Sequence, residues 1–145
     1  LAGLYGVIID RRMLFEGTFL LDFAKEKEFT FSQLGLVTEY SVKGQLLGHL
    51  VMGAQEVAAV ASELGIPEDK SVLLQHMILS HHGEPEFGAA VKPICAESEL
   101  LSQIDMLDSR MEIYRETLAG LRVGEVSNRI FALDKRVFKP HELNG

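Results

Sequence analysis

Five polar residues stand within otherwise apolar segments of this 145-residue chain, and all are of types that bind divalent metal ions. They are Asp22, His49, the adjacent pair His81 and His82, and Asp105. Carboxylate oxygens and imidazole nitrogens together suit Mn²⁺, Fe²⁺, Co²⁺ or Zn²⁺, and the sequence does not choose among these ions and Mg²⁺. If the fold brings these side chains together, we expect a divalent metal site.

Each of these residues also has an ordinary structural interpretation. His49 on an apolar helix could be a core histidine hydrogen-bonded to a backbone carbonyl. His81 and His82 at a helix C-terminus could complement the helix dipole, and Asp22 could form a salt bridge along its own helix. A carboxylate among apolar neighbours, as at Asp105, costs on the order of several kcal/mol without a cation or several donors. Taken together, the residues favour one shared metal site gathered across a helical bundle.

Helices must position these side chains, because apolar residues recur at helical spacing over four segments. We predict helices over residues 10–29, 44–64, 66–82 and 94–121. The second helix should turn inward Leu46, Leu47, Leu50, Val51, Val57 and Val60. Residues 30–43 suggest a loop or a short hairpin, residues 83–93 a loop, and residues 122–145 extended segments. The predicted fold class is therefore all-α, a helical bundle with a short extended C-terminal tail.

The composition fits one compact domain over residues 1–145, with 47% hydrophobic residues and a formal charge of −7. Because this net charge repels a polyanion, nucleic-acid binding would need a local basic groove, a metal ion or a second domain. No apolar run approaches the roughly 20 residues that span a bilayer, and no leader peptide is evident. The single cysteine, Cys95, cannot form an internal disulfide. These features favour a cytoplasmic protein without membrane partners.

Several long motifs resemble a known family. They are Gly44 to His49, Leu74 to Gly83, Glu97 to Ser109 and Ser127 to Pro140. This pattern resembles the C-terminal HD domain of the YhaM-type 3′-to-5′ exoribonucleases, which belong to the HD superfamily of metal-dependent phosphohydrolases. Members of that family carry an OB-type nucleic-acid-binding module ahead of the HD domain. Nothing in the chain resembles that module or the first helix of the HD domain, so we expect a single HD-like domain that lacks both.

The resemblance implies metal-assisted hydrolysis of an RNA or nucleotide phosphodiester. Carried over residue by residue, it implies the metal ligands Asp22, His49, His81 and Asp105. Lys25 matches a family lysine that contacts a phosphate or the attacking water. His82 would replace His81 or orient a phosphate. The implied catalytic set is therefore Asp22, Lys25 and His82.

Leu21 stands where the family's HD motif has its histidine, and the family's first metal-binding histidine has no counterpart in the chain. Because leucine coordinates no metal, we predict at most one bound ion, held by Asp22, His49 and His81. Two functions remain open. The first is a phosphodiesterase or exoribonuclease, impaired by the missing ligands. The alternative is a degenerate, catalytically inactive HD domain that serves nucleotide or RNA binding, regulation or homo-oligomerisation.

Overall fold

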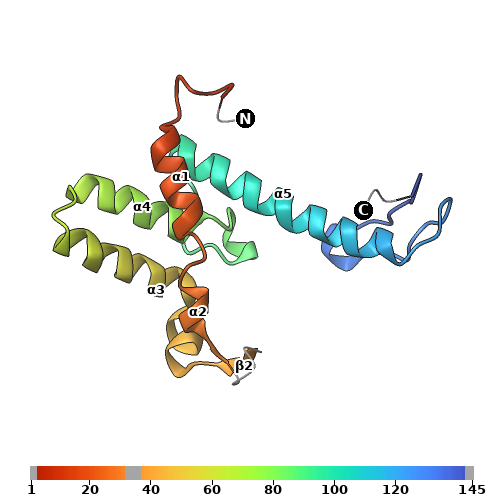
Figure 1. The fold of residues 1–145 in the computed structure, drawn as a ribbon, viewed down its shortest axis with the longest axis horizontal. Coiled ribbons are helices and arrows are strands. Elements are labelled where there is room, and N and C mark those ends of the chain that lie inside the picture. The colour runs from red at the N-terminus through yellow and green to blue at the C-terminus, as the bar shows by residue number, and fades with distance from the viewer. Residues whose placement is uncertain (1–2, 32–36, 143–145) are drawn as a thin grey trace. The chain divides into compact units, whose positions relative to one another are not determined.

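Helices dominate the computed structural model, which describes residues 3–31 and 37–142 (Figure 1). In chain order the elements are α1 (Arg11–Leu20), α2 (Lys25–Glu28), β1 (Phe29–Phe31), β2 (Val37–Tyr40), α3 (Val42–Glu63), α4 (Glu68–Ser80), the 3₁₀ helix η1 (Pro85–Phe87), α5 (Ala96–Ala119) and the 3₁₀ helix η2 (Phe131–Leu133). The predicted all-α fold class is confirmed. The chain divides into two compact units, Leu1–Gln103 and Ile104–Gly145. Its description as a single HD-like domain stays a prediction.

The first unit is built on the hairpin of α3 and α4, which pack side by side (Figure 1). Gly65 makes the turn between them with a φ of 65°, a left-handed backbone that glycine adopts without strain. Two apolar clusters hold the helices together. One contains Ile9, Leu14, Met77 and Leu101, and the other contains Val57, Leu74 and Ile78. Because Met77 and Ile78 are adjacent and fully buried, α4 contributes to both clusters.

The N-terminal helix is shorter than the sequence predicted. We expected one helix over residues 10–29, but α1 ends at Leu20, residues 21–24 form turns, and α2 covers only Lys25–Glu28. The break lets Leu14 pack in the cluster of Met77 while Phe23 packs in the other cluster, against Val57. Tertiary packing therefore overrides the continuous helical pattern.

The predicted inward face of α3 is only partly correct. Leu50 and Val57 are buried, whereas Leu46, Leu47 and Val60 are exposed. The cause lies at Gly48, whose φ of 67° and ψ of 164° interrupt the helix. Residues before this break do not share the rotational phase of those after it, so one continuous helical periodicity cannot describe both.

A short antiparallel hairpin connects α2 to α3, within the segment predicted as a loop or hairpin. Phe29 pairs with Tyr40 and Thr30 with Glu39. The rings of Phe29 and Tyr40 lie 4.7 Å apart, a cross-strand aromatic contact that stabilises the pair. The hairpin returns the chain to Ser41, which caps the N-terminus of α3 through a hydrogen bond from the Gly44 N–H to its hydroxyl.

The second unit comprises the later part of α5 and the tail that follows it. The tail folds back on itself through two antiparallel bridges, between Val126 and Phe138 and between Ile130 and Lys135. Leu133 and Val137 are its buried anchors. The extended tail of the sequence prediction is therefore a hairpin-like segment with η2 at its tip.

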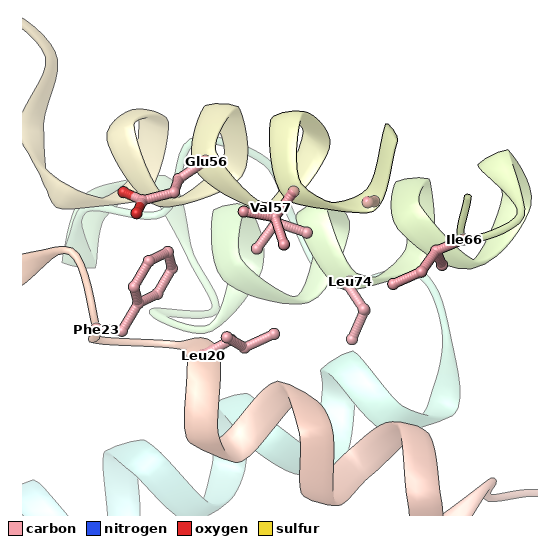
Figure 2. A pocket seen from close by; sticks show the side chains of 8 residues that line it. Leu20, Phe23, Glu56, Val57, Ile66 and Leu74 are labelled. Carbon is pink, nitrogen blue, oxygen red and sulfur yellow. The ribbon is translucent and has the colours of Figure 1, made fainter. Parts of the chain in front are cut away.

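A small apolar pocket of about 170 Å³ lies in the first unit. In Figure 2, Leu20 at the end of α1 and Phe23 in the turn after it face Val57 of α3. Leu74 and Ile66 close the other side of the pocket. No metal-ligating histidine lines it. Within the described residues, no helix is both long and apolar enough to cross a membrane.

Candidate metal centre

Four of the predicted site residues meet in the first unit. Asp22 lies in the turn between α1 and α2, His49 follows the break in α3, and His81 and His82 follow the last residue of α4. His81 is fully buried, and the side chain of His49 is only 14% exposed. The ligand nitrogens of the three histidines all lie within 4.8 Å of one another.

The separations between Asp22 and two histidines suit a shared ion better than direct hydrogen bonds. Oδ1 of Asp22 lies 3.6 Å from Nε2 of His49 and 3.6 Å from Nε2 of His81. Nε2 of His49 lies 3.3 Å from Nε2 of His82, a hydrogen bond when one of the two rings carries its proton there. Two ligands bound at about 2.0–2.1 Å to a tetrahedral ion are roughly 3.3–3.4 Å apart. The donor set therefore fits a divalent cation without a large rearrangement.

Two of the donor atoms are buried without a hydrogen bond. Nε2 of His81 and Oδ1 of Asp22 are shielded from solvent, and among the described residues the only close charged partner of Oδ1 besides the histidines is the Lys25 ammonium. Buried polar atoms normally make a hydrogen bond because leaving one unmade costs about 1–3 kcal/mol. The two atoms lie 3.6 Å apart, a separation that a shared cation would bridge.

Contacts on the opposite ring nitrogens orient two of the histidines, a hydrogen bond for His81 and an ion-pair contact for His49. Nδ1 of His81 lies 2.8 Å from the carbonyl oxygen of Ile78, which can only accept, so the neutral ring carries its proton on Nδ1. Nδ1 of His49 lies 3.1 Å from Oε2 of Glu28. In both rings Nε2 is thereby left as a lone-pair donor that points into the cluster. This arrangement of outer partners is typical of metal-binding histidines.

Charge at the centre favours an ionised Asp22. Burial raises the pKa of this carboxyl, but Lys25, together with the His81 ring whenever that ring is protonated, outweighs burial and holds the pKa well below its usual range. Nζ of Lys25 lies 2.8 Å from Oδ1 of Asp22 as an ion pair, outside the alignment of a hydrogen bond. Because the Lys25 side chain is 44% exposed, its ammonium is also accessible to an anion at the site.

Glu28 was not among the predicted site residues, and it is the residue on which His49 depends. Its carboxylate contacts Nδ1 of His49 and also accepts the His49 backbone N–H at 3.2 Å. That N–H is free because the break at Gly48 removes it from the helical ladder. In the sequence, Glu28 is the last of four alternating charges, Lys25 to Glu28, which looks like a solvated face. Two features of the sequence could have indicated the role of Glu28. Gly48 stands directly before His49, and Glu28 lies one turn after Lys25.

Gly44 allows α3 to approach Glu28. A Cβ at this position would lie 2.2 Å from the Glu28 carbonyl oxygen and 2.9 Å from its Cα, which no side chain tolerates without a shift. The same carbonyl accepts the Ser41 N–H at 2.9 Å. The N-terminus of α3 therefore clamps the backbone that carries the Glu28 carboxylate.

Two further sequence predictions concern Asp105 and Leu21. Asp105 is half-buried on α5 in the second unit, so its role as a metal ligand stays a prediction. Its neighbours Ile104, Met106 and Leu107 are exposed, so the apolar surroundings expected from the sequence are not found. Leu21 packs on the apolar cluster of Leu14 and Met77.

Comparison with known proteins gives a consistent set of relatives. The chain is 41% identical over 130 residues to the 3′-5′ exoribonuclease YhaM of Bacillus licheniformis and 39% identical over 130 residues to that of Bacillus subtilis, in each case 90% of this chain and 40% of the relative. It is 37% identical over 142 residues to the protein of the same name from Halalkalibacterium halodurans, 97% of this chain and 43% of the relative. The chain thus spans about two fifths of the length of these relatives. No family model and no solved structure matches it.

Proposed function

We propose that this chain belongs to the YhaM-type 3′-to-5′ exoribonucleases and is a metal-dependent phosphodiesterase region of the HD type. The observation that carries the proposal is the pair of buried atoms that make no hydrogen bond, Nε2 of His81 and Oδ1 of Asp22, 3.6 Å apart beside His49 and His82. Similarity to proteins named as exoribonucleases over 90% of the chain supports RNA as the substrate class.

Asp22, His49 and His81 would hold the ion, and a ring nitrogen of His82 could supply a further ligand. A divalent ion at such a site supplies Lewis-acid polarisation of a phosphate oxygen and lowers the pKa of water. We propose that one ion binds, because Leu21 contributes packing where the family has a ligand. The metal can be Mn²⁺, Fe²⁺, Co²⁺, Zn²⁺ or Mg²⁺.

The chain's own residues would perform three tasks in hydrolysis. Asp22, held ionised by Lys25 and His81, keeps a negative ligand at the centre at all physiological pH values. Lys25 places a positive charge within reach of a phosphate oxygen, where it would stabilise the charge that develops as the phosphodiester is attacked. Glu28 keeps the His49 ring turned so that Nε2 faces Asp22 and the proposed ion.

Hydrolysis of a short single-stranded RNA and of bis-p-nitrophenyl phosphate, with and without added Mn²⁺, tests this function. We expect Mn²⁺-dependent shortening of the RNA from its 3′ end, abolished by chelation and reduced at least about 100-fold by His49→Ala. The matched control is His141→Ala, because His141 is an exposed histidine in the second unit. An unaltered chain that binds metal but leaves both substrates intact would instead support the degenerate, inactive HD domain.

Asp105 is tested by titration with Mn²⁺. If Asp105 supplies a ligand, as the resemblance implies, Asp105→Asn lowers metal affinity by about ten- to a hundredfold. Asp108→Asn is the control, since Asp108 is an exposed aspartate one turn later on α5. Equal metal affinity in the two variants would remove Asp105 from the site.

A further inference from the structure

The tip of the C-terminal hairpin-like segment, residues 129–136, carries an almost fully exposed aromatic ring. Phe131 is 98% exposed, whereas Leu133, two residues later in the same 3₁₀ turn, is buried. The turn is closed by hydrogen bonds from the Ile130 N–H to the Lys135 carbonyl at 2.8 Å and from the Asp134 N–H to the Phe131 carbonyl at 3.1 Å. The fold therefore anchors Leu133 and presents Phe131 to solvent.

Three cationic residues lie within five positions of Phe131 in the sequence. Arg129 forms an ion pair with Asp134 across the turn. Nζ of Lys135 lies 5.4 Å above the ring of Tyr114, a cation–π distance. Arg136 is exposed and forms no ion pair with any described residue, so its guanidinium is available to an external anion.

Charge along the chain is strongly uneven at this point. Residues 129–136 contain three basic residues and one acidic residue, whereas the rest of the chain contains eleven basic and twenty acidic residues. Because Arg129 is paired with Asp134, Lys135 and Arg136 carry the net positive charge of the tip. A polyanion is repelled by most of the molecule but attracted by this segment. The tip thus supplies the local basic surface that nucleic-acid binding by an acidic protein requires.

We infer that the tip is a contact site for single-stranded RNA, with a base stacked on Phe131 and the phosphates beside it bound by Arg136 and Lys135. Stacking needs a free base face, which single strands offer and duplexes do not. The exposed Phe131 ring, close in sequence to basic residues, fits this ligand better than it fits a protein interface, because the centre of such an interface is apolar and depleted of charge. The choice of RNA rests on the proposed function, whereas the stacking and charge argument rests on the tip alone.

Fluorescence anisotropy with a labelled oligouridylate tests the aromatic contact. The measurement is made in EDTA, so that neither hydrolysis nor the metal centre contributes. We expect Phe131→Ala to raise the Kd at least about fivefold and Phe131→Trp to restore it, because base stacking tolerates any large ring. The matched control is Phe19→Ala, since Phe19 is also highly exposed but lies on α1.

The salt dependence of the same Kd tests the phosphate contact. For single strands, each neutralised phosphate contributes about 0.7 to the slope of log K against log salt concentration. We therefore expect Arg136→Gln to reduce the magnitude of that slope by about 0.7, while Arg12→Gln, an exposed arginine of α1 paired with Glu16, leaves it unchanged.

Several results would overturn the inference. They are no measurable RNA binding by the unaltered chain, equal Kd values for Phe131→Ala and Phe19→Ala, or a change in sedimentation mass on Phe131→Ala without a change in Kd. The last result would identify the tip as a protein interface. Thermal unfolding of each variant verifies that the fold is intact. If the unaltered chain binds RNA in the anisotropy measurement but shows no Mn²⁺-dependent hydrolysis, the result would count against the proposed function and would leave the assignment of the tip unaffected.

Discussion

The carboxylate of Glu28 holds His49 from two directions. Oε2 lies 3.1 Å from Nδ1 of the ring, and Oε1 accepts the backbone N–H of the same residue at 3.2 Å. The first contact fixes the rotation of the imidazole, and the second fixes the backbone that carries it. A single side chain thus determines both where His49 stands and which nitrogen it presents to Asp22.

Replacing Glu28 should therefore weaken metal binding without removing a ligand. We expect Glu28→Ala to lower metal affinity by about ten- to a hundredfold, the usual effect of losing an outer partner of a metal-bound histidine. The control is Glu26→Gln, which removes an exposed charge two residues away. Titration with Mn²⁺ measures the affinity, and nitrogen chemical shifts of the metal-free protein report the His49 tautomer. An unchanged tautomer population in Glu28→Ala would contradict the assigned role.

A methyl group at Gly44 should displace the backbone of Glu28 and thereby disturb the contacts of Glu28 with His49. Gly44→Ala places a Cβ against the Glu28 carbonyl, so α3 and α2 must separate. We expect the free energy of unfolding to fall by about 1–3 kcal/mol, together with a loss of metal affinity. Chemical denaturation measures the first and metal titration the second. Gly120→Ala, where the nearest atom would be 3.7 Å away, is the control and should change neither.

Acid should destabilise the first unit through His76. Nε2 of His76 accepts the backbone N–H of Ile94 at 3.1 Å and lies 3.2 Å from Oγ of Ser98, and burial lowers its pKa. Because the folded protein binds this proton less readily than the unfolded chain, the contribution is present above the unfolded pKa, about 6.5, and is lost as the pH falls through and below that value.

The measurement is the free energy of unfolding at pH 7.5 and at pH 5.5, taken for the unaltered chain and for two variants. We expect the drop toward pH 5.5 to be smaller in His76→Gln, whose amide oxygen can still accept the Ile94 N–H. His141→Gln, an exposed histidine, should retain the full drop. An identical pH dependence in all three proteins would remove His76 as its source.

Leu21→His tests whether position 21 can supply a metal ligand. If Leu21 stands in the place of a metal-binding histidine, as the resemblance implies, we expect Leu21→His to raise the metal content measured by elemental analysis and to raise any phosphodiesterase activity. Some loss of stability should accompany it, since Leu21 packs on the apolar cluster of Leu14 and Met77. Leu20→His, whose side chain lines the separate apolar pocket, is the control. Equal metal content in the two variants would count against a vacant ligand position at residue 21.

The sequence predicted the all-α fold class and the types of residue that meet at the centre. Histidine and aspartate within apolar segments can be buried at low free-energy cost only where they find polar or charged partners. It did not predict the exact helix limits. The break at Gly48 depends on a carboxylate 20 residues earlier, and the break after Leu20 depends on which cluster each side chain joins. Glu28 was missed for the same reason, since its role comes from a contact between distant segments and a charge run shows no sign of it.

The α3–α4 hairpin has a consequence for how a metal ion would exchange at the centre. His49 and His81 each lie 16 residues from the tight turn at Gly65, so α3 and α4 must pair along much of their length before the two imidazoles meet. Asp22 and Glu28 reach them from a segment outside that hairpin. A segment that docks on a folded hairpin can open locally while the hairpin stays intact. We therefore expect metal exchange to proceed through local opening of the segment from Asp22 to Glu28, without unfolding of α3 and α4.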